Sequence, residues 1–273
     1  MGILDTITAH KRIEVARQKE AVPLALLLNL GSQRLNRPTI SMRRALEQSS
    51  SGIIAEFKRR SPSKGWLAPN AKIEEVIPAY ARGGAAACSI LTDSDFFGGS
   101  FTDLQQARAL VQLPLLRKDF IINDYQIYQS RVLGADVILL IAACLTRNEC
   151  KQLAQIAHQL ELEVLLEIHS ESELSHFNEH VDMLGVNNRN LSTFQTDTEN
   201  SFRMIERIKA EVGTGEEAPL LVSESGISDI ETIKKLREAG FQGFLIGEAM
   251  MREAPSNSPH RGEPNITLPY GGD

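Results

Sequence analysis

The segment Ile53-Ile54-Ala55-Glu56-Phe57-Lys58-Arg59-Arg60-Ser61-Pro62-Ser63-Lys64-Gly65 begins as a short apolar run and ends in a carboxylate and several cations. The run predicts a buried strand that places Glu56 and Lys58 at its carboxyl end. Charged side chains are seldom buried without a partner, so their alternation with Ala55 and Phe57 suggests that one strand face points into a polar site. A surface salt bridge at a strand end would explain this segment alone equally well.

Apolar runs typical of strands recur along the chain, and stretches with helical periodicity separate them. The runs lie near Ile53, Ala87, Leu115, Val137, Val164, Met183, Leu220 and Phe244, and the helical stretches are 73–82, 103–111, 125–133, 147–159, 202–212 and 229–239. This alternation predicts parallel strands with helical crossovers, and eight units in about 250 residues match a closed (β/α)8 TIM barrel. An open doubly wound sheet fits less well, since no Gly-x-Gly-x-x-Gly follows an early strand.

Two further segments flank the barrel, which we expect over residues 49–253. Residues 1–48 predict an N-terminal helical extension, with helices over 3–19 and 42–48, that covers the barrel or flanks its mouth. Residues 254–273 are rich in Pro, Gly, Ser and Asn without apolar periodicity, which predicts an irregular, disordered tail.

The composition excludes several classes of protein. The 273 residues are 42% hydrophobic and 23% charged, as in ordinary soluble chains. The net charge of -6 argues against nucleic-acid binding, because surfaces that neutralise phosphates carry an excess of Lys and Arg. The longest early apolar stretch, 21–30, is too short to span a bilayer and resembles no signal peptide. We therefore expect a cytoplasmic protein with no nucleic-acid and no membrane partner.

Three cysteines, Cys88, Cys144 and Cys150, fit neither an even disulfide framework nor a paired metal-ligand spacing. Cys88 and Cys144 lie in apolar, strand-like runs. We interpret all three as reduced residues of the core.

Polar residues follow nearly every predicted strand at its carboxyl end, the face where barrels of this kind carry their chemistry. They are Glu56 and Lys58, Thr92-Asp93, Lys118-Asp119, Glu167, Asn187-Asn188-Arg189, Glu224-Ser225-Gly226 and Gly247-Glu248. Lys118 and Glu167 are a candidate proton donor and acceptor across the mouth, with burial and neighbouring charges to tune both pKa values. A plain ion pair between Lys118 and Asp119 or a neighbouring acid is the alternative.

Two glycine-bearing strand ends, 223–227 and 245–249, fall on the seventh and eighth loops of the predicted barrel. Glycine lets a ligand approach backbone N–H groups closely, and a short helix after Gly247 would aim its positive end at a phosphate. Each motif alone fits a simple strand end, but together they predict a phosphomonoester substrate. Aromatic side chains at Phe97 and Phe120 lie beside this pocket and suit a flat ring.

Six motifs resemble those of indole-3-glycerol phosphate synthases and follow the same order. They are Glu-Phe-Lys-Arg-Arg-Ser-Pro-Ser-Lys-Gly (56–65), Phe-Phe-Gly-Gly-Ser (96–100), Leu-Arg-Lys-Asp-Phe-Ile (116–121), Leu-Leu-Glu-Ile-His (165–169), Gly-Val-Asn-Asn-Arg-Asn-Leu (185–191) and Ser-Glu-Ser-Gly-Ile (223–227). The resemblance covers roughly residues 1–252. It implies a carboxy-lyase of tryptophan biosynthesis that converts 1-(2-carboxyphenylamino)-1-deoxyribulose 5-phosphate to indole-3-glycerol phosphate, with loss of carbon dioxide and water.

The resemblance also implies roles for individual residues. Lys118 would be the general acid that activates the substrate carbonyl for ring closure, and Lys58 would be a second cation. Glu56 and Glu167 would handle later proton transfers, and Asn187 and Ser225 complete the catalytic set. The expected substrate contacts are Asn187 and Arg189 with carboxylate or hydroxyl groups, Ser61 and Ser225 with other polar groups, Gly226, Gly247 and the amide of Glu248 with phosphate, and Phe97, Phe120, Leu139 and Leu191 with the ring.

No metal and no organic cofactor is implied by the resemblance. The partner it implies is a small phosphosugar that carries an anthranilate ring, bound by a monomer or a weak homo-oligomer. The family's final amphipathic helix is not encoded after residue 253, where Pro255, Pro259 and Pro264 would break it. We therefore expect lower stability than in relatives, or another segment or chain over the gap.

Two alternatives stay open at this point. One is another phosphosugar enzyme on the same barrel, which would use Lys118 as a Schiff-base nucleophile. The other is a non-catalytic binding protein whose barrel is compromised by the altered C-terminus.

Overall fold

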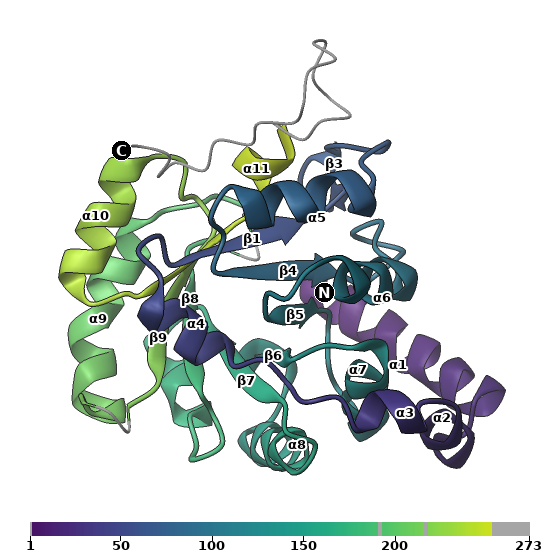
Figure 1. Cartoon of the computed structure of the whole chain (residues 1–273). Coiled ribbons are helices and arrows are strands. Elements are labelled where there is room, and N and C mark those ends of the chain that lie inside the picture. Colours follow the sequence, from purple (N-terminus) through teal and green to yellow (C-terminus); the bar gives the residue numbers. More distant parts are fainter. Residues whose placement is uncertain (1, 191–192, 216–217, 253–273) are drawn as a thin grey trace.

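The computed structural model describes residues 2–190, 193–215 and 218–252, and in this part of the chain eight parallel strands form a closed barrel (Figure 1). Their order around the ring is β1-β10-β9-β8-β7-β6-β5-β4, so β1 pairs with both β4 and β10. The strands are β1 (Ile53–Phe57), β4 (Ala87–Leu91), β5 (Leu115–Lys118), β6 (Val137–Ile141), β7 (Glu163–Ile168), β8 (Met183–Asn187), β9 (Leu220–Glu224) and β10 (Gly243–Ile246). The predicted TIM barrel is confirmed.

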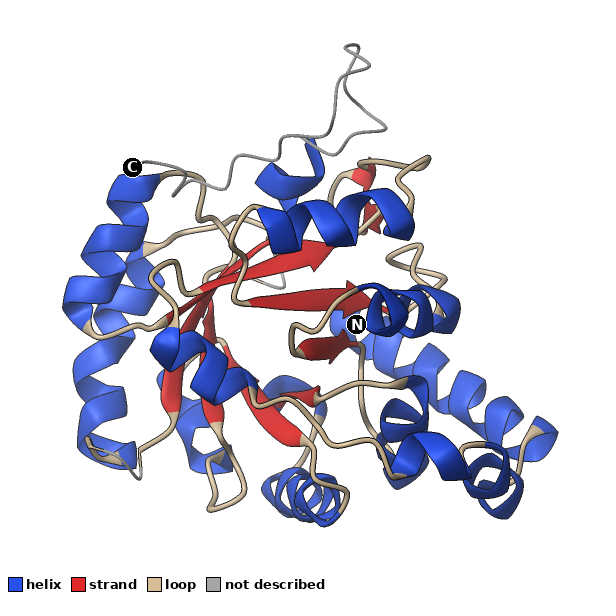
Figure 2. Cartoon of the chain, in the orientation of Figure 1, coloured by secondary structure: helices blue, strands red, loops and turns tan. Residues whose placement is uncertain are grey.

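Helices surround this ring on its outer side (Figure 2). They are α5 (Ile73–Arg82), α6 (Phe101–Leu110), α7 (Asp124–Leu133), α8 (Arg147–Gln159), α9 (Glu199–Val212), α10 (Ile230–Ala239) and the short α11 (Glu248–Arg252). Helix α6 begins earlier than the sequence predicted because the Ser100 hydroxyl accepts a hydrogen bond of 3.1 Å from the Asp103 N–H and caps it. Two 3₁₀ turns, η1 (Ala142–Cys144) and η2 (Glu171–His176), follow β6 and β7.

Four helices precede the barrel and cover both of its ends. They are α1 (Ile3–Ala21), α2 (Leu24–Leu30), α3 (Ser32–Leu35) and α4 (Met42–Gln48), of which α2 and α3 were not predicted. Met42 and Leu46 of α4 are buried with side chains of the barrel interior and close its amino-terminal end. The N-terminus lies beside the carboxyl ends of β4 and β5 (Figure 1), so α1 flanks the mouth.

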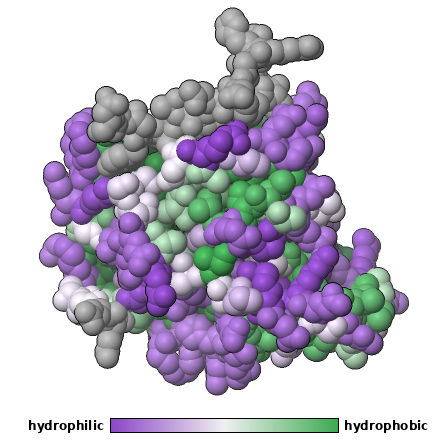
Figure 3. All heavy atoms as spheres, viewed as in Figure 1, coloured by the Kyte–Doolittle hydropathy of each residue, from purple (hydrophilic) through white to green (hydrophobic). Residues whose placement is uncertain are grey.

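Apolar side chains fill the space inside the ring and the space between strands and helices, as in a packed (β/α)8 barrel. Hydrophilic side chains dominate the rim of the face seen in Figure 3, and hydrophobic ones gather toward its middle. The three cysteines are free thiols, and Cys88 and Cys150 are buried in the core as predicted, whereas Cys144 is only half-buried. Among the described helices, none combines the length and the apolar character that a membrane span requires. The predicted tail over 254–273 lies outside the described residues.

A buried ionic network ties α1 to the barrel. The Lys11 ammonium is fully buried and lies 2.9 Å from Asp93 and 3.0 Å from Asp119, and Asp119 also contacts Arg117 at 2.9 Å. Burial alone would lower the pKa of Lys11, but the carboxylates of Asp119 and Asp93 outweigh that effect and raise it. Asp93 accepts hydrogen bonds from the N–H groups of the loop after β4, so the network also fixes that loop.

Replacement of Lys11 by Met is expected to lower the free energy of unfolding by about 3 to 5 kcal/mol, because it leaves buried carboxylates without their counter-charge. Urea denaturation of the variant and the wild type measures the difference. The matched control is Lys19→Met on the same helix, whose ammonium makes only an exposed hydrogen bond to Asn123. A Lys11 variant as stable as this control would contradict the assigned role.

Candidate active site

The carboxyl ends of the strands open into a cavity of about 480 Å³, a size typical of small-molecule sites. Every predicted site residue that the structure describes lines it: Glu56, Lys58, Ser61, Phe97, Lys118, Phe120, Leu139, Glu167, Asn187, Arg189, Ser225, Gly226, Gly247 and Glu248. The predicted residue Leu191 lies outside the described residues. The cavity therefore collects side chains from strands and loops that are far apart in the sequence.

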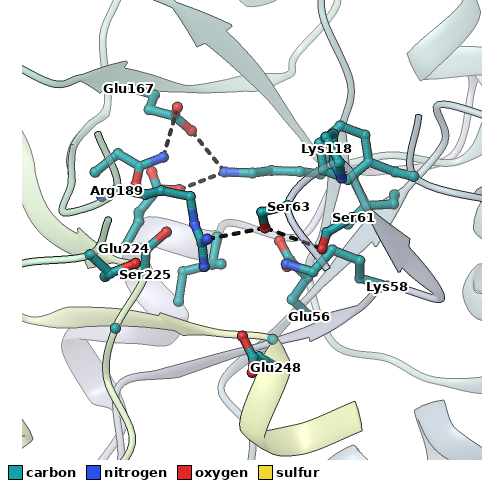
Figure 4. A pocket seen from close by; sticks show the side chains of 18 of the residues that line it. Glu56, Lys58, Ser61, Ser63, Lys118, Glu167, Arg189, Glu224, Ser225 and Glu248 are labelled. Atoms are coloured by element: carbon teal, nitrogen blue, oxygen red, sulfur yellow. Dashed lines mark hydrogen bonds and ion pairs between the residues drawn. The ribbon is translucent and has the colours of Figure 1, made fainter. Parts of the chain in front are cut away.

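Lys118, the last residue of β5, reaches across the mouth and ends between two carboxylates (Figure 4). Its Nζ lies 2.9 Å from Oε2 of Glu167 and 2.5 Å from Oε2 of Glu224. Burial alone would lower the pKa of Lys118, but Glu167, Glu224 and Glu56 outweigh burial and raise it, so the side chain is an ammonium. The alternative pair with Asp119 is not formed, because that carboxylate faces Arg117 and Lys11, whereas ion pairs with neighbouring acids are formed, to Glu167 and Glu224.

Glu167, on β7, is held as a carboxylate by donors at both of its oxygens. Oε2 faces Lys118, while Oε1 accepts a hydrogen bond of 3.0 Å from the Asn187 amide and lies 3.3 Å from Nε2 of His169. Burial raises the pKa of Glu167, but Lys118 and His169 more than offset this and hold it well below the ordinary value. Glu167 is therefore ionised at neutral pH, and it becomes a stronger base once Lys118 has given up its proton.

Glu224, at the end of β9, is the functional residue that the sequence analysis left out of the site. Burial raises the pKa of Glu224 to about 7, and the charges of Glu167 and Glu56 add to this while Lys118 opposes it. The two carboxyl groups that contact the Lys118 ammonium therefore differ in pKa: that of Glu224 is raised and that of Glu167 is lowered. Such a difference is typical of an acid and a base in one site. Its position beside Ser225 and Gly226 was visible in the sequence, but roles were assigned only to those two neighbours.

Glu56 and Lys58 lie on the same face of the chain at the end of β1 and form an ion pair of 2.5 Å. Glu56 is only 3% exposed, so the alternative of a surface salt bridge is wrong. Gly247 makes room for this carboxylate, because a Cβ at that position would lie 2.3 Å from Oε1 of Glu56. Three buried carboxylates and two ammonium groups thus share one side of the cavity.

The loop between β1 and α5 folds over the mouth through a short hairpin, β2 (Arg60–Ser61) with β3 (Gly65–Trp66). Two polar contacts join this loop to other loops across the cavity. Arg189 donates to the Ser63 hydroxyl at 3.2 Å (Figure 4), and the Lys64 ammonium lies 2.5 Å from the Glu248 carboxylate. Glu248 thus has a cation beside it that offsets its negative charge.

After β9 the chain turns sharply at two successive residues with left-handed backbone. Ser225 has a φ of 69° and Gly226 a φ of 79°. The left-handed region is unfavourable for serine, and such strained residues cluster at ligand sites. A Cβ at position 226 would lie 2.4 Å from the Thr196 methyl group, so only glycine fits there.

The other side of the cavity is apolar. The rings of Phe97 and Phe120 lie 6.0 Å apart at 40°, and Leu139 of β6 lies near them in the same lining. Helix α1 adds three further side chains, Ile3, Leu4 and Ile7. The sequence placed α1 near the mouth but gave no signal for which of its residues face a ligand.

Replacement of Glu224 by Gln should make the protein relatively more stable as the pH rises. The folded wild type binds a proton at Glu224 more tightly than the unfolded chain does, so the free energy of unfolding falls between about pH 4.5 and 7. Glu224→Gln removes this loss, and its stability relative to the wild type should increase by about 1 to 3 kcal/mol from pH 5 to pH 8. Urea denaturation across this range measures the difference.

The control for that experiment is Glu206→Gln, which removes a carboxylate that is 85% exposed on α9. Its stability relative to the wild type should stay level over the same range. A level difference for Glu224→Gln as well would show that Glu224 is ionised in the folded protein at all these pH values.

Comparison with known proteins identifies relatives along almost the whole chain. The profile of the family described as indole-3-glycerol phosphate synthase matches residues 4–260. A protein of that name from Bacteroides thetaiotaomicron is 54% identical over 252 residues, covering 92% of this chain and 93% of that protein. Another, from Polaromonas sp. strain JS666, is 43% identical over 253 residues, covering 92% of this chain and 93% of that protein.

Solved structures of lower similarity share the barrel. The N-acetylmannosamine-6-phosphate 2-epimerase from Clostridium perfringens has a TM-score of 0.56 at 15% identity, over 79% of this chain and 93% of that one. A tryptophan synthase chain from Pyrococcus furiosus has a TM-score of 0.54 at 13% identity, over 74% and 90%. At these identities the likeness concerns the fold alone.

Proposed function

Because the chain belongs to the indole-3-glycerol phosphate synthase family, we propose that its buried lysine and glutamate cluster performs the proton transfers of that reaction. The chain is a carboxy-lyase of tryptophan biosynthesis, which converts 1-(2-carboxyphenylamino)-1-deoxyribulose 5-phosphate to indole-3-glycerol phosphate with release of carbon dioxide and water. One observation carries the proposal: the Lys118 ammonium lies between two carboxyl groups whose pKa values are shifted in opposite directions.

The substrate would lie between the polar and the apolar side of the cavity. Its phosphate would sit at the loops after β9 and β10, where Gly226, Gly247 and Glu248 line the cavity, and the N–H of Glu248 would donate to it. Its aromatic ring would lie against the apolar wall, and its carboxylate or hydroxyl groups would meet Asn187 and Arg189, the guanidinium being suited to bidentate contact. The side chains of Ser61 and Ser225 would position the remaining polar groups, and the ring contact of Leu191 stays a prediction.

Ring closure would use Lys118 as the general acid. The ring carbon that carries the carboxylate attacks the ketone carbon, and the electron pair of the C=O bond moves to the oxygen, which takes a proton from Lys118. The bond to the carboxylate then breaks, carbon dioxide leaves and the electron pair returns to the ring. An ammonium already positioned in a buried site stabilises the developing oxyanion without reorganisation, and Lys58 would be a second cation nearby.

Dehydration would then need one group to give a proton and another to remove one. Glu224, with a pKa of about 7, can hold the proton that the departing hydroxyl requires. Glu167, held ionised, can remove the proton from the adjacent methylene carbon so that the indole double bond forms. Glu56, in contact with Lys58, would assist these later transfers.

The proposal also includes a cytoplasmic location and a chain that works as a monomer or a weak homo-oligomer. Free thiols suit a reducing compartment. All the acid and base groups assigned above come from a single chain, so the chemistry requires no residue from a second copy.

Turnover of the substrate, followed by the fluorescence of the indole product, tests the proposal directly. Lys118→Ala and Glu167→Gln should each lower kcat by about 10²- to 10⁴-fold, the range for loss of a general acid or base. The control is Lys72→Ala, an exposed lysine that pairs with Glu75 at the start of α5 and should leave kcat unchanged.

Two results would contradict the proposal. A folded wild-type chain without turnover would favour the non-catalytic barrel, and borohydride trapping of the substrate on Lys118 would favour the Schiff-base alternative.

A further inference from the structure

His169 follows β7 directly behind Glu167 and does not line the cavity. Its ring lies between two carboxylates, with Nε2 at 3.3 Å from Oε1 of Glu167 and Nδ1 at 3.6 Å from Oε2 of Glu173. Both ring nitrogens are buried, and neither makes a hydrogen bond of full geometry to another described residue. The ring therefore lies beside Glu167 and outside the cavity in which a substrate would bind.

Glu173, in the 3₁₀ turn η2, fixes the position of this histidine. Its Oε2 accepts a hydrogen bond of 2.6 Å from the backbone N–H of His169, so the carboxylate is held beside the ring. Burial alone would lower the pKa of His169, but Glu167 and Glu173 raise it to about 9. The imidazole is thus charged at neutral pH, although it is only 12% exposed.

Other charged groups around this pair are few among the described residues. Lys118 of β5 faces Oε2 of Glu167, and the charge of His176 in η2 lowers the pKa of Glu173. Burial raises the pKa of the Cys144 thiol in η1 to about 12, and the charges of Glu167 and Glu173 contribute to this rise. The charge of Arg12 on α1 lowers the pKa of that thiol. The pKa of His169 is raised by Glu167 and Glu173 and not by these other groups.

The reaction itself has an unmet requirement for protons. The substrate enters as a carboxylate, and its carboxyl carbon leaves as neutral carbon dioxide. The ketone oxygen takes up two protons before it leaves as water, while the methylene carbon gives up one. Each turnover therefore consumes one proton, which the cluster around Lys118 has to recover from outside.

We propose that His169 supplies this proton to Glu167, with Glu173 as the group that orients the imidazole. The inference rests on the proposed role of Glu167. Glu167 first returns the methylene proton to Lys118, with which it is in contact, and is then an empty carboxylate. In this step the N–H bond at Nε2 breaks, its electron pair stays on nitrogen, and an O–H bond forms at Oε1 of Glu167. Glu167 passes this proton through Lys118 to Glu224, the group still lacking one. The neutral ring keeps its other proton on Nδ1, toward Glu173, and regains a proton from water before the next turnover. His169 is thus a positioning and proton-supplying residue that acts through Glu167.

The pH dependence of kcat tests this role. Wild-type kcat should fall as the pH rises through about 9, where the imidazolium loses its proton. His169→Asn should lower kcat by about 10- to 100-fold with KM changed less than about twofold, and it should lack that fall. In His169→Ala, added imidazole should restore part of the lost kcat. Glu173→Gln keeps the ring but removes one carboxylate, so the alkaline fall should move to lower pH.

The matched control is His158→Asn, which removes another histidine paired with a carboxylate. His158 lies 2.9 Å from Asp182, at the opposite end of the barrel from the cavity, so its loss should leave the pH profile of kcat unchanged.

The proposal is overturned if His169→Asn keeps the wild-type kcat or the wild-type alkaline fall. It is also overturned if activity is lost without imidazole rescue and Glu173→Gln leaves the profile in place, because that pattern indicates a structural ion pair. The Glu167→Gln variant distinguishes a failure of the proposed function from a failure of the proton supply alone. Turnover by that variant would refute the proposed function, whereas an inactive Glu167→Gln beside normal His169 variants would refute the proton supply alone.

Discussion

The contact of one ammonium with two buried carboxyl groups is the constraint on which the rest of this site depends. An ion is stable away from water only when opposite charges and hydrogen-bond donors surround it. Lys118 on β5, Glu167 on β7 and Glu224 on β9 meet this requirement only because the closed ring places the ends of these strands around one cavity. Burial raises the pKa of Glu224, and the neighbouring carboxylates Glu167 and Glu56 raise it further.

Successive side chains at the end of strand β5 belong to two different charged networks, one in the cavity and one that fixes the strand end. Lys118 points into the mouth (Figure 4), whereas its neighbours Arg117 and Asp119 pair with each other and contact α7 and Lys11 of α1. Two charged networks therefore lie one residue apart without sharing a partner. The outer one fixes the strand end, and the inner one contains Glu224, whose raised pKa lets it exchange a proton.

Much of the fold could be predicted from the sequence because strand runs, helical periods and turn residues are local signals. The placement of Lys118 and Glu167 followed from the rule that barrel strands end at one face. The partnership of Lys118 with Glu224 did not, because it depends on the register of strands far apart in the sequence. Helix α2 was missed because its short apolar stretch shows no amphipathic period, and the contact of Ile7 with the cavity depends on how α1 docks.

The closed amino-terminal end of the barrel limits how protons reach the carboxylates. Met42 and Leu46 of α4 fill that end with apolar side chains, so neither water nor an ion has a polar route along the barrel axis. A substrate that fills the cavity would also block the mouth. What is left is a route through the wall, and the polar pair behind Glu167 consists of His169 and the partly exposed Glu173 of η2. A proton can pass through this pair while a substrate still fills the cavity, which is the function proposed for this histidine.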